Sequence, residues 1–295
     1  MATLREIRRR IKSVKSTAQI TKAMELVAAS KMRRAQERVL ASRPYAEKMH
    51  EILSYLSVAT KTTGATLHPL LARHDTGKVC VVMITSDRGL CGSFNINIIR
   101  HVLDFITHHR DAGDDVAVVA VGKRGRDFMV RYGASLVGEF TGLGDKPTIL
   151  DIAPIVRLVI SGYTNGTFRS VYLAYSQFIS TVTQKPIIIP IIPIEEEHLA
   201  AGLGENNIRT LDYIFEPGAG EILNALLPRY IEVETYQALL ESVASEQSAR
   251  MVAMHNATDN ANDIIDSLTL TYNKARQAAI TKELIDITTS ASAIG

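Results

Sequence analysis

The sequence contains no tryptophan, and its 295 residues include only two cysteines, Cys80 and Cys91. The spacing of these cysteines fits neither a Cys-x-x-Cys redox pair nor a zinc-binding pattern, which favours a reducing compartment. The eight histidines show no His-x-x-x-His spacing, so His108, His109 and His255 are expected at the solvated surface. We therefore expect no metal site and no cofactor.

Long hydrophobic runs are also missing. The longest, Ile187–Ile194, contains Pro190 and Pro193 and is far shorter than the roughly 20 apolar residues that a membrane-spanning helix needs. The first residues show neither the apolar core of a signal peptide nor a presequence rich in arginine and serine. We expect a bacterial protein that is used without cleavage and is not inserted into the bilayer.

The sequence also lacks a large excess of charge of one sign. It has 33 Lys and Arg against 31 Asp and Glu, which gives a net charge of +2. This balance favours neither nucleic acid nor an anionic membrane as a partner. The distribution is uneven, with thirteen Lys/Arg against four Glu in residues 1–48 and five Lys/Arg against twelve Asp/Glu in residues 212–295. The two ends of the chain are therefore predicted to attract each other.

Glycine is absent from residues 4–60, which hold a single proline and are rich in Ala, Arg, Lys, Glu and Met. This composition predicts one long helix. Its coiled-coil seam repeats at steps of three and four and comprises Leu4, Ile7, Ile11, Val14, Ala18 and Thr21. A second long helix is predicted from Ala219 to about Thr288. Because helices of this length exceed the width of a domain, the two are expected to pair antiparallel.

The middle of the chain changes its hydrophobic period. Short β-branched runs, typical of strands, lie at residues 79–85, 116–121, 170–176 and 186–192, and helix-like stretches lie at 97–108 and 154–163. Alternation of this kind predicts an α/β domain with a largely parallel sheet. We divide the chain into an N-terminal helix at 1–60, an α/β domain at 78–210, and a turn followed by the C-terminal helix at 211–295.

One strand-to-turn segment suggests a nucleotide site, because the run at 116–121 leads into Gly122-Lys123-Arg124-Gly125. The spacing fits neither the G-x-G-x-x-G dinucleotide motif nor the P-loop. These glycines are therefore expected to close a structural turn between a strand and a helix. A Rossmann-like enzyme with helical extensions remains an alternative, which binding of a nucleotide by the isolated chain would support.

A second polar segment, residues 85–95, combines Ser86, Asp87, Arg88 and Cys91 after a strand. It lacks the G-x-S-x-G spacing and a nearby histidine base, so it does not resemble a hydrolase site. Turn chemistry and an exposed loop that contacts a partner are both compatible with it. The basic run at 5–15 leaves a coiled-coil scaffold or a nucleic-acid binder as a further alternative, which salt-sensitive binding to DNA or RNA would reveal.

Three separated segments resemble the gamma-subunit family of F-type ATP synthases. They are residues 7–32 (IRRRIKSVKSTAQITKAMELVAASKM), residues 86–92 (SDRGLCG) and residues 245–281, from SEQSARMVAM to YNKARQAAIT. The resemblance implies a fold of mixed α and α/β class, a long antiparallel coiled coil of the terminal helices with a central Rossmann-like α/β domain. It implies a bacterial type, without the redox insert of the chloroplast form.

The same resemblance implies a central rotor shaft that has no catalytic site. The shaft would transmit torque between the c-ring and a head of three alpha and three beta subunits, which couples proton transport to ATP synthesis or hydrolysis. It would sit beside the epsilon subunit at the cytoplasmic face of the plasma membrane, with no nucleic-acid partner. The residues implied to contact beta or alpha are Lys22, Met24, Glu25, Arg88, Glu246, Arg250, Arg276, Gln277, Thr281 and Glu283. Tyr213 and Phe215 would form a foot near the c-ring and epsilon.

The two prolines of the long helices suggest a pairing register. If Pro44 and Pro228 kink the two helices at one level, then Met24 faces about Ser248 and Met1 faces about Thr271. The last roughly 24 residues would overhang as a single helix. This register would place Lys22 and Glu25 beside Glu246 and Arg250, where opposite charges could pair.

Overall fold

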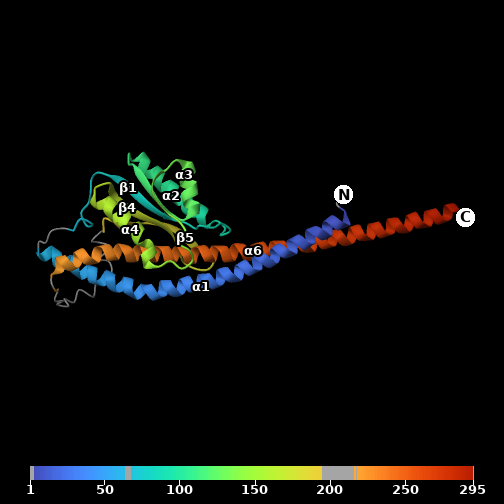
Figure 1. Cartoon of the computed structure of the whole chain (residues 1–295), viewed down its shortest axis with the longest axis horizontal. Helices are drawn as coiled ribbons and strands as arrows, with labels where there is room; N and C mark the ends of the chain where they lie inside the picture. Colours follow the sequence, from blue (N-terminus) through green and yellow to red (C-terminus); the bar gives the residue numbers. More distant parts are fainter. Residues whose placement is uncertain (1–2, 64–67, 195–215, 217, 295) are drawn as a thin grey trace. The chain divides into compact units, whose positions relative to one another are not determined.

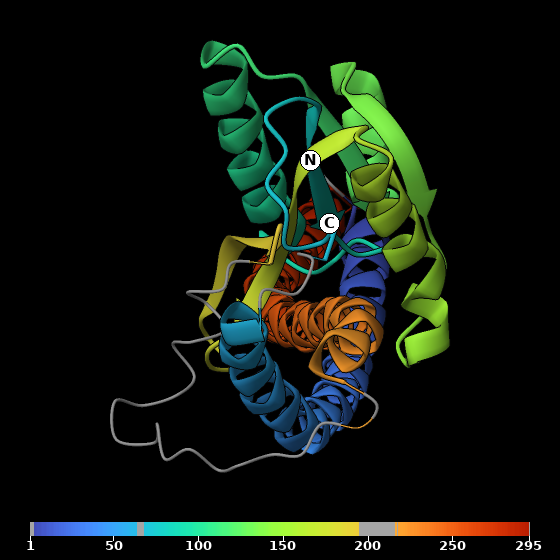
Figure 2. The same cartoon turned by 90° about the vertical axis from the view of Figure 1, so that its left-hand side faces the viewer.

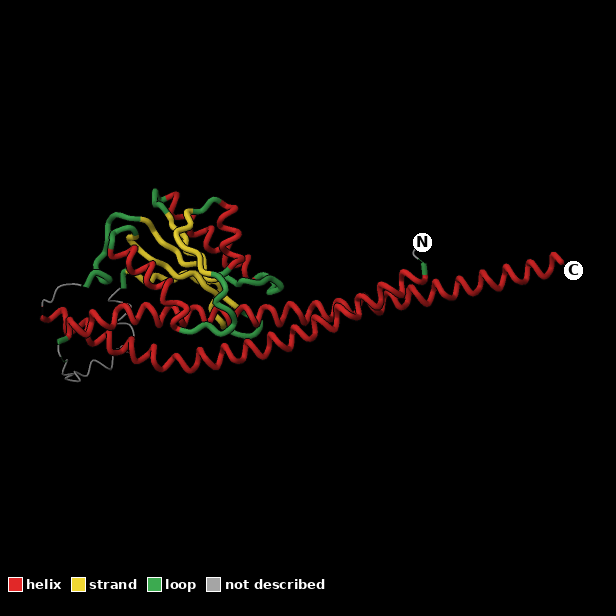
Figure 3. The backbone as a smooth tube through the Cα atoms, in the orientation of Figure 1, coloured by secondary structure: helices red, strands yellow, loops and turns green. Residues whose placement is uncertain are grey.

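A computed structural model describes residues 3–63, 68–194, 216 and 218–294 of the chain (Figure 1). The chain forms two compact units. Unit 1 comprises Met1–Ala29 with Arg250–Gly295, and unit 2 comprises Ser30–Ala249. Helix α1, Leu4–Thr63, and helix α6, Ala219–Ile294, contribute to both units. The residue ranges of α1 and α6 agree with those of the two long helices predicted from the sequence. All the strands that the structure describes belong to unit 2, as Figure 3 shows.

Helix α1 begins at a capping box. The backbone N–H of Thr3 donates to the Glu6 carboxylate at 2.9 Å, and the backbone N–H of Glu6 donates to Thr3 Oγ1 at 3.3 Å. These two bonds satisfy donors that the first turn of a helix leaves open. None of the helices that the structure describes has a stretch long and apolar enough to cross a membrane.

Unit 1 is an antiparallel pair formed by the first part of α1 and the last part of α6. The predicted seam is confirmed, since its six α1 residues are buried or half-buried while most of their neighbours are exposed. On α6 the buried positions include Met254, Thr258 and Ala261. The small side chains of Ala18 and Ala261 allow the two backbones to approach closely. Beyond Ala275, residues 276–290 of α6 are exposed.

The register proposed from the two prolines is wrong. In unit 1, Thr21 Oγ1 lies 2.7 Å from Thr258 Oγ1, whereas the proline register would have placed Thr21 opposite Met251. In unit 2, the ring of His50 packs edge-on against Tyr230 at 5.7 Å between centroids, whereas the proline register would have placed Ile222 there. In both units α1 therefore pairs with α6 residues about two turns further along than Pro44 and Pro228 suggest, because buried side chains set the pairing.

The α/β domain of unit 2 is built on a five-stranded sheet of order β3-β2-β1-β4-β5. Its strands are β1 Lys78–Ile84, β2 Val116–Val121, β3 Ser135–Phe140, β4 Phe168–Phe178 and β5 Gln184–Ile192. The first four are parallel, and β5 pairs antiparallel with β4. The largely parallel sheet is thus confirmed, but β3 was not predicted. Its side chains alternate between exposed and half-buried, and Gly138 interrupts the β-branched pattern.

Helices cover both faces of this sheet. Alternate residues of β1 divide between two cores, so that Val79, Val81 and Met83 pack against α2, Phe94–Asp111, and α3, Lys123–Tyr132. Cys80, Val82 and Ile84 face α4, Ile149–Thr164, together with α1 and α6. Figure 2 shows α1 and α6 side by side on this face. The long helices of unit 2 are therefore part of the core of the α/β domain.

Candidate partner-binding surfaces

The loop after β1 is held in a fixed conformation by Asp87. Its Oδ1 accepts the backbone N–H of Lys123 at 2.9 Å, and its Oδ2 accepts that of Gly142 at 3.0 Å. Lys123 is the first residue of α3, so this carboxylate occupies the place where a helix N-terminus would otherwise bind a phosphate. One side chain thus connects the ends of three neighbouring strands.

Gly122 closes the turn between β2 and α3, as the sequence predicted, whereas Gly125 lies in the first turn of α3. Gly122 has φ of 98°, and a Cβ placed on it would lie 2.1 Å from the Thr85 carbonyl oxygen. A Cβ on Gly125 would lie 2.5 Å from Met83 Cε. Gly122 therefore permits a close approach of backbone to backbone, and Gly125 permits a close approach of α3 to the side chains of Met83 and Thr85.

The remaining bonds of the loop support the turn interpretation of residues 85–95. The backbone N–H of Ser86 donates to Asn95 Oδ1 at 3.0 Å, and Asn95 Nδ2 donates to Cys91 Sγ at 3.2 Å. Leu90 adopts φ of 65°, which is uncommon for a residue other than glycine, and its side chain is 64% exposed. Arg88 is also exposed. Contact of Arg88 with a partner stays a prediction.

Helix α6 forms hydrogen bonds with β4 beside the switch point of the sheet. Strand order reverses between β1 and β4, which is where doubly wound sheets bind their ligands beyond the carboxyl ends of the strands. Here Ser245 Oγ donates to the Ser176 carbonyl oxygen at 2.9 Å, and Ser248 Oγ donates to the Thr181 carbonyl oxygen at 2.7 Å. Helix α6 is therefore bonded to β4 and to the β4–β5 connection, next to the place where this fold usually binds ligands.

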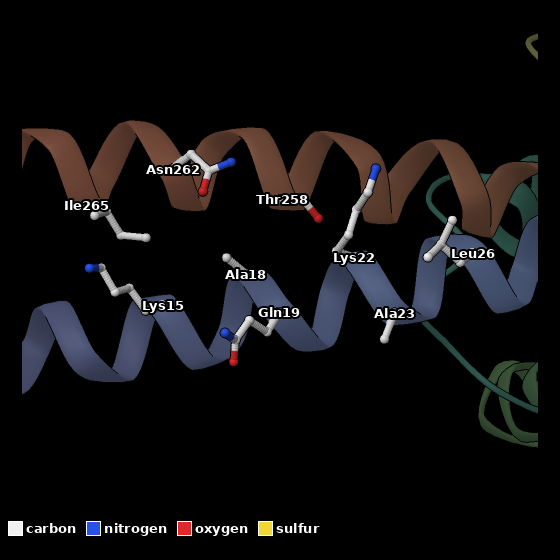
Figure 4. A pocket seen from close by; sticks show the side chains of 9 residues that line it. All are labelled: Lys15, Ala18, Gln19, Lys22, Ala23, Leu26, Thr258, Asn262 and Ile265. Atoms are coloured by element: carbon white, nitrogen blue, oxygen red, sulfur yellow. The ribbon is translucent and has the colours of Figure 1, made fainter.

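A groove runs along the helix pair of unit 1 and is shown in Figure 4. Two lysines, Lys15 and Lys22, lie on its α1 side and are exposed. The other lining residues are Ala18, Gln19, Ala23, Leu26, Thr258, Asn262 and Ile265. An apolar floor edged by ammonium groups suits an acidic, partly apolar surface of another chain.

Three of the predicted contact residues lie near this groove. Lys22 Nζ pairs with Glu25 at 3.0 Å, one turn along α1, and Met24 is half-buried. Glu25 also lies 3.4 Å from His255 Nδ1 of α6. His255 was expected at the surface and is exposed. Its position beside Glu25 was not predicted, because the register drawn from the two prolines was wrong.

The other predicted contact residues are placed as follows. Arg250 of unit 1 and Glu246 of unit 2 are half-buried. Arg276, Gln277, Thr281 and Glu283 are exposed on the last part of α6. The structure therefore brings Lys22, Met24 and Glu25 together on one turn of α1 and leaves the last four on the exposed part of α6. Tyr213 and Phe215, the predicted foot, lie outside the described residues.

A group of titratable side chains, of which Tyr175 is buried and Glu234, Glu241 and Tyr230 are half-buried, lies where α1, α6 and β4 pack in unit 2. Burial, and then the neighbouring Glu241, raise the pKa of Glu234 above its usual value. Burial raises the pKa of Glu241 despite a hydrogen bond from Gln237 and the charge of Arg43. Burial also raises the pKa of Tyr175 and of Tyr230. These carboxyl groups are therefore held closer to their neutral form.

Sequence reasoning missed Asp145, which lies in the segment between β3 and α4. Its Oδ2 pairs with Lys31 Nζ of α1 at 2.6 Å, and its Oδ1 accepts a hydrogen bond from Gln247 Nε2 of α6 at 3.2 Å. The side chain thus bridges three segments far apart in the chain. From the sequence one could expect Lys31 to pair with some acidic residue. Nothing in the sequence indicates that this residue is Asp145.

These surfaces belong to a protein of two long paired helices, which in unit 2 pack against one face of an α/β sheet. The family model described as ATP synthase matches residues 3–294. The ATP synthase gamma chain of Herpetosiphon aurantiacus is 49% identical over 300 residues and covers 100% of this chain and 99% of its own length. The gamma chain of Chloroflexus aurantiacus is 48% identical over 295 residues, with the same coverage.

The chain belongs to the ATP synthase gamma chain family, as its three sequence motifs predicted. Among solved structures, the central stalk and c-ring of the mitochondrial ATP synthase of Tetrahymena thermophila contains a chain with a TM-score of 0.59 and 28% identity. That likeness covers 81% of this chain and 99% of the other. A chain of the Euglena gracilis mitochondrial ATP synthase has a TM-score of 0.64 at 19% identity and shows the shared fold.

Proposed function

We propose that this chain is the central rotor shaft of an F-type ATP synthase, which transmits torque between a c-ring and a head of alpha and beta subunits. The observation that carries the proposal is the match to gamma chains along the full length, at 49% identity. The solved relative from Tetrahymena belongs to a central stalk. The bonds from Ser245 and Ser248 to β4 and the β4–β5 connection, which fasten α6 to the α/β domain, support a mechanical role.

The proposed mechanism is coupling by differential contact. The surface of unit 1 is chemically uneven around its axis, because basic α1 carries Lys15 and Lys22 while α6 carries Asp259, Asp263 and Asp266. Each orientation of the pair would present a different surface to each beta subunit and bias its nucleotide site. A ligand or partner shifts a conformational equilibrium only by its difference in affinity for the two states.

Residues at four places carry the proposed contacts with alpha and beta. Lys22, Met24 and Glu25 lie beside the lysine-edged groove, and Arg88 lies on the exposed loop after β1. Glu246 and Arg250 belong to the half-buried middle of α6. The exposed end of α6 would turn within the head through Arg276, Gln277, Thr281 and Glu283.

The other proposed partners are the epsilon subunit and the c-ring, reached through a foot that includes Tyr213 and Phe215. The proposed location is the cytoplasmic face of a bacterial plasma membrane, to which the chain would be attached only through its partners. The bacterial relatives support this location, since they come from Herpetosiphon, Chloroflexus and Dehalococcoides.

The proposal is tested by co-expression with alpha and beta subunits of a related bacterium. The full chain is expected to co-purify with both and to support ATP synthesis driven by a proton gradient in reconstituted vesicles. A chain ending at Ala275, which lacks the exposed part of α6, should still assemble but lose much of this coupled synthesis. Purification of the full chain free of both subunits would contradict the proposal.

A further inference from the structure

The carboxylate of Asp145 is the meeting point of three segments of unit 2. It belongs to the segment between β3 and α4, pairs with Lys31 of α1 at 2.6 Å, and accepts a hydrogen bond from Gln247 of α6 at 3.2 Å. Lys31 and Asp145 keep 34% and 45% of their side-chain surface exposed. An ion pair this exposed contributes little to stability. The position of the Asp145 carboxylate, which joins three segments of the chain at one point, therefore says more about its role than its contribution to stability does.

Further directional contacts lie on the same stretch of α6. Ser245 Oγ donates to the Ser176 carbonyl at the end of β4, and Ser248 Oγ donates to the Thr181 carbonyl in the β4–β5 connection. Gln184 Nε2 donates to Ser248 Oγ at 3.3 Å. Residues 245–248 of α6 are therefore hydrogen-bonded to β4 and to the β4–β5 connection. Through Gln247 they are also bonded to Asp145.

Much of the remaining interface is apolar and includes Ala238, Leu239, Val243 and Ala244 of α6, although Tyr236 Oη also donates to the Pro147 carbonyl at 3.3 Å. Apolar contact is non-directional, so it opposes separation of two surfaces more than sliding of one along the other. Hydrogen bonds weaken steeply with misalignment. The hydrogen bonds at residues 245–248 point to different segments of the α/β domain. Rotation of α6 about its own axis, relative to that domain, would therefore break several of these bonds together.

We propose that Asp145, Ser245 and Ser248 form a torque-bearing joint, which fixes the α/β domain to both long helices. Asp145 is its positioning residue, because it acts through Lys31 and Gln247 rather than on any substrate. This inference rests on the proposed function, since a joint of this kind matters only in a chain that turns under load. It assigns a mechanical role to residues outside the surfaces that contact alpha and beta.

The test uses the full chain assembled with alpha and beta subunits and a magnetic bead attached to the α/β domain. The exposed residue for attachment is introduced by His108→Cys, and the native Cys80 and Cys91 are buried. With the head locked by a non-hydrolysable nucleotide, the angular fluctuations of the bead measure torsional stiffness. The variant Asp145→Ala/Ser245→Ala/Ser248→Ala should widen the variance of the angle by about twofold, as expected when coupled contacts are lost together.

A matched control is Arg33→Ala, because the Arg33–Glu37 pair at 3.3 Å lies within α1 alone; its fluctuations should equal those of the unsubstituted chain. A second set reverses the ion pair with Lys31→Glu and Asp145→Lys. Each single change should widen the fluctuations, and the two together should narrow them again. A general loss of stability would not be repaired by this exchange.

Two results would overturn the joint: unchanged fluctuations in the triple variant, or no recovery when the two charge reversals are combined. ATP-driven rotation of the bead on the unsubstituted complex is recorded first. Absence of that rotation would contradict the proposed function itself, whereas rotation with unchanged stiffness in the triple variant would contradict the joint alone.

Discussion

The hydroxyl oxygens of Thr21 and Thr258 lie 2.7 Å apart across the helix pair of unit 1. Each hydroxyl can also donate to a carbonyl of its own helix, Thr21 to Ala18 at 3.1 Å and Thr258 to Met254 at 2.9 Å, so either can be the donor across the pair. This contact fixes which residues of α1 and α6 face each other.

Cysteines at the two positions should cross-link. The pair Thr21→Cys/Thr258→Cys is expected to form a disulfide under mild oxidation, because the two side chains end in contact and disulfides require close Cβ atoms. The pair Thr21→Cys/Met251→Cys, which follows the proline register, should not form one. Electrophoresis without reductant distinguishes the two. A cross-link in the second pair and none in the first would restore the proline register.

Replacement of Gly122 should be far more damaging than replacement of another glycine with positive φ. Gly122→Ala places a Cβ 2.1 Å from the Thr85 carbonyl oxygen, whereas Gly113, with φ of 87°, has nothing within 4 Å of the same position. We expect Gly113→Ala to cost about 1–2 kcal/mol and Gly122→Ala to exceed about 4 kcal/mol. Urea unfolding of the purified chains measures both, and equal losses would be inconsistent with the close approach at Gly122.

Removal of the Asp87 carboxylate should loosen the edge of the sheet. Asp87→Ala leaves the backbone donors of Lys123 and Gly142 without their acceptor, which is expected to cost about 1–3 kcal/mol. Asp87→Asn keeps one acceptor oxygen and should cost less. Hydrogen exchange at the amides of residues 123 and 142 should quicken most in the alanine variant. No change in exchange at these two amides would argue against the bonding described.

The stability of the chain should respond to pH through Glu234. Burial and the charge of Glu241 raise its pKa in the folded state, so its penalty is absent below the unfolded pKa of about 4.3. The penalty sets in as the pH rises above that value and is complete once the pH passes the folded pKa. Glu234→Gln should therefore gain stability relative to the unsubstituted chain as the pH is raised from 4 to 8.

Thermal or urea unfolding at a series of pH values checks this prediction. Glu221→Gln, at an exposed position of the same helix, controls for the loss of a surface charge. If Glu234→Gln instead loses stability relative to the unsubstituted chain as the pH rises, the pKa of Glu234 is not raised in the folded state.

Local patterns in the sequence predicted most of the fold. The seam from Leu4 to Thr21 and the absence of glycine defined α1, and β-branched runs located β1, β2, β4 and β5. Strand β3 escaped notice because it lies at the sheet edge, where half-exposed side chains relax the hydrophobic pattern. The family motifs indicated the contact residues, since those motifs are local stretches of chain.

Contacts between distant residues could not be predicted in the same way. The register failed because two prolines gave a single alignment point, whereas the pairing follows side chains such as Thr21, Thr258, His50 and Tyr230. Asp145 escaped because its partners Lys31 and Gln247 are 114 and 102 residues away in the chain. An acidic residue in a polar segment gives no indication of such partners until the fold is known.

The carboxylate of Asp87 lies at the start of α3, in an α/β architecture that many enzymes use to hold phosphate. Here the domain supplies its own anion, because the two backbone donors of Lys123 and Gly142 are already bonded to Asp87. A phosphate that approached this turn would therefore meet a negative charge instead of open donors.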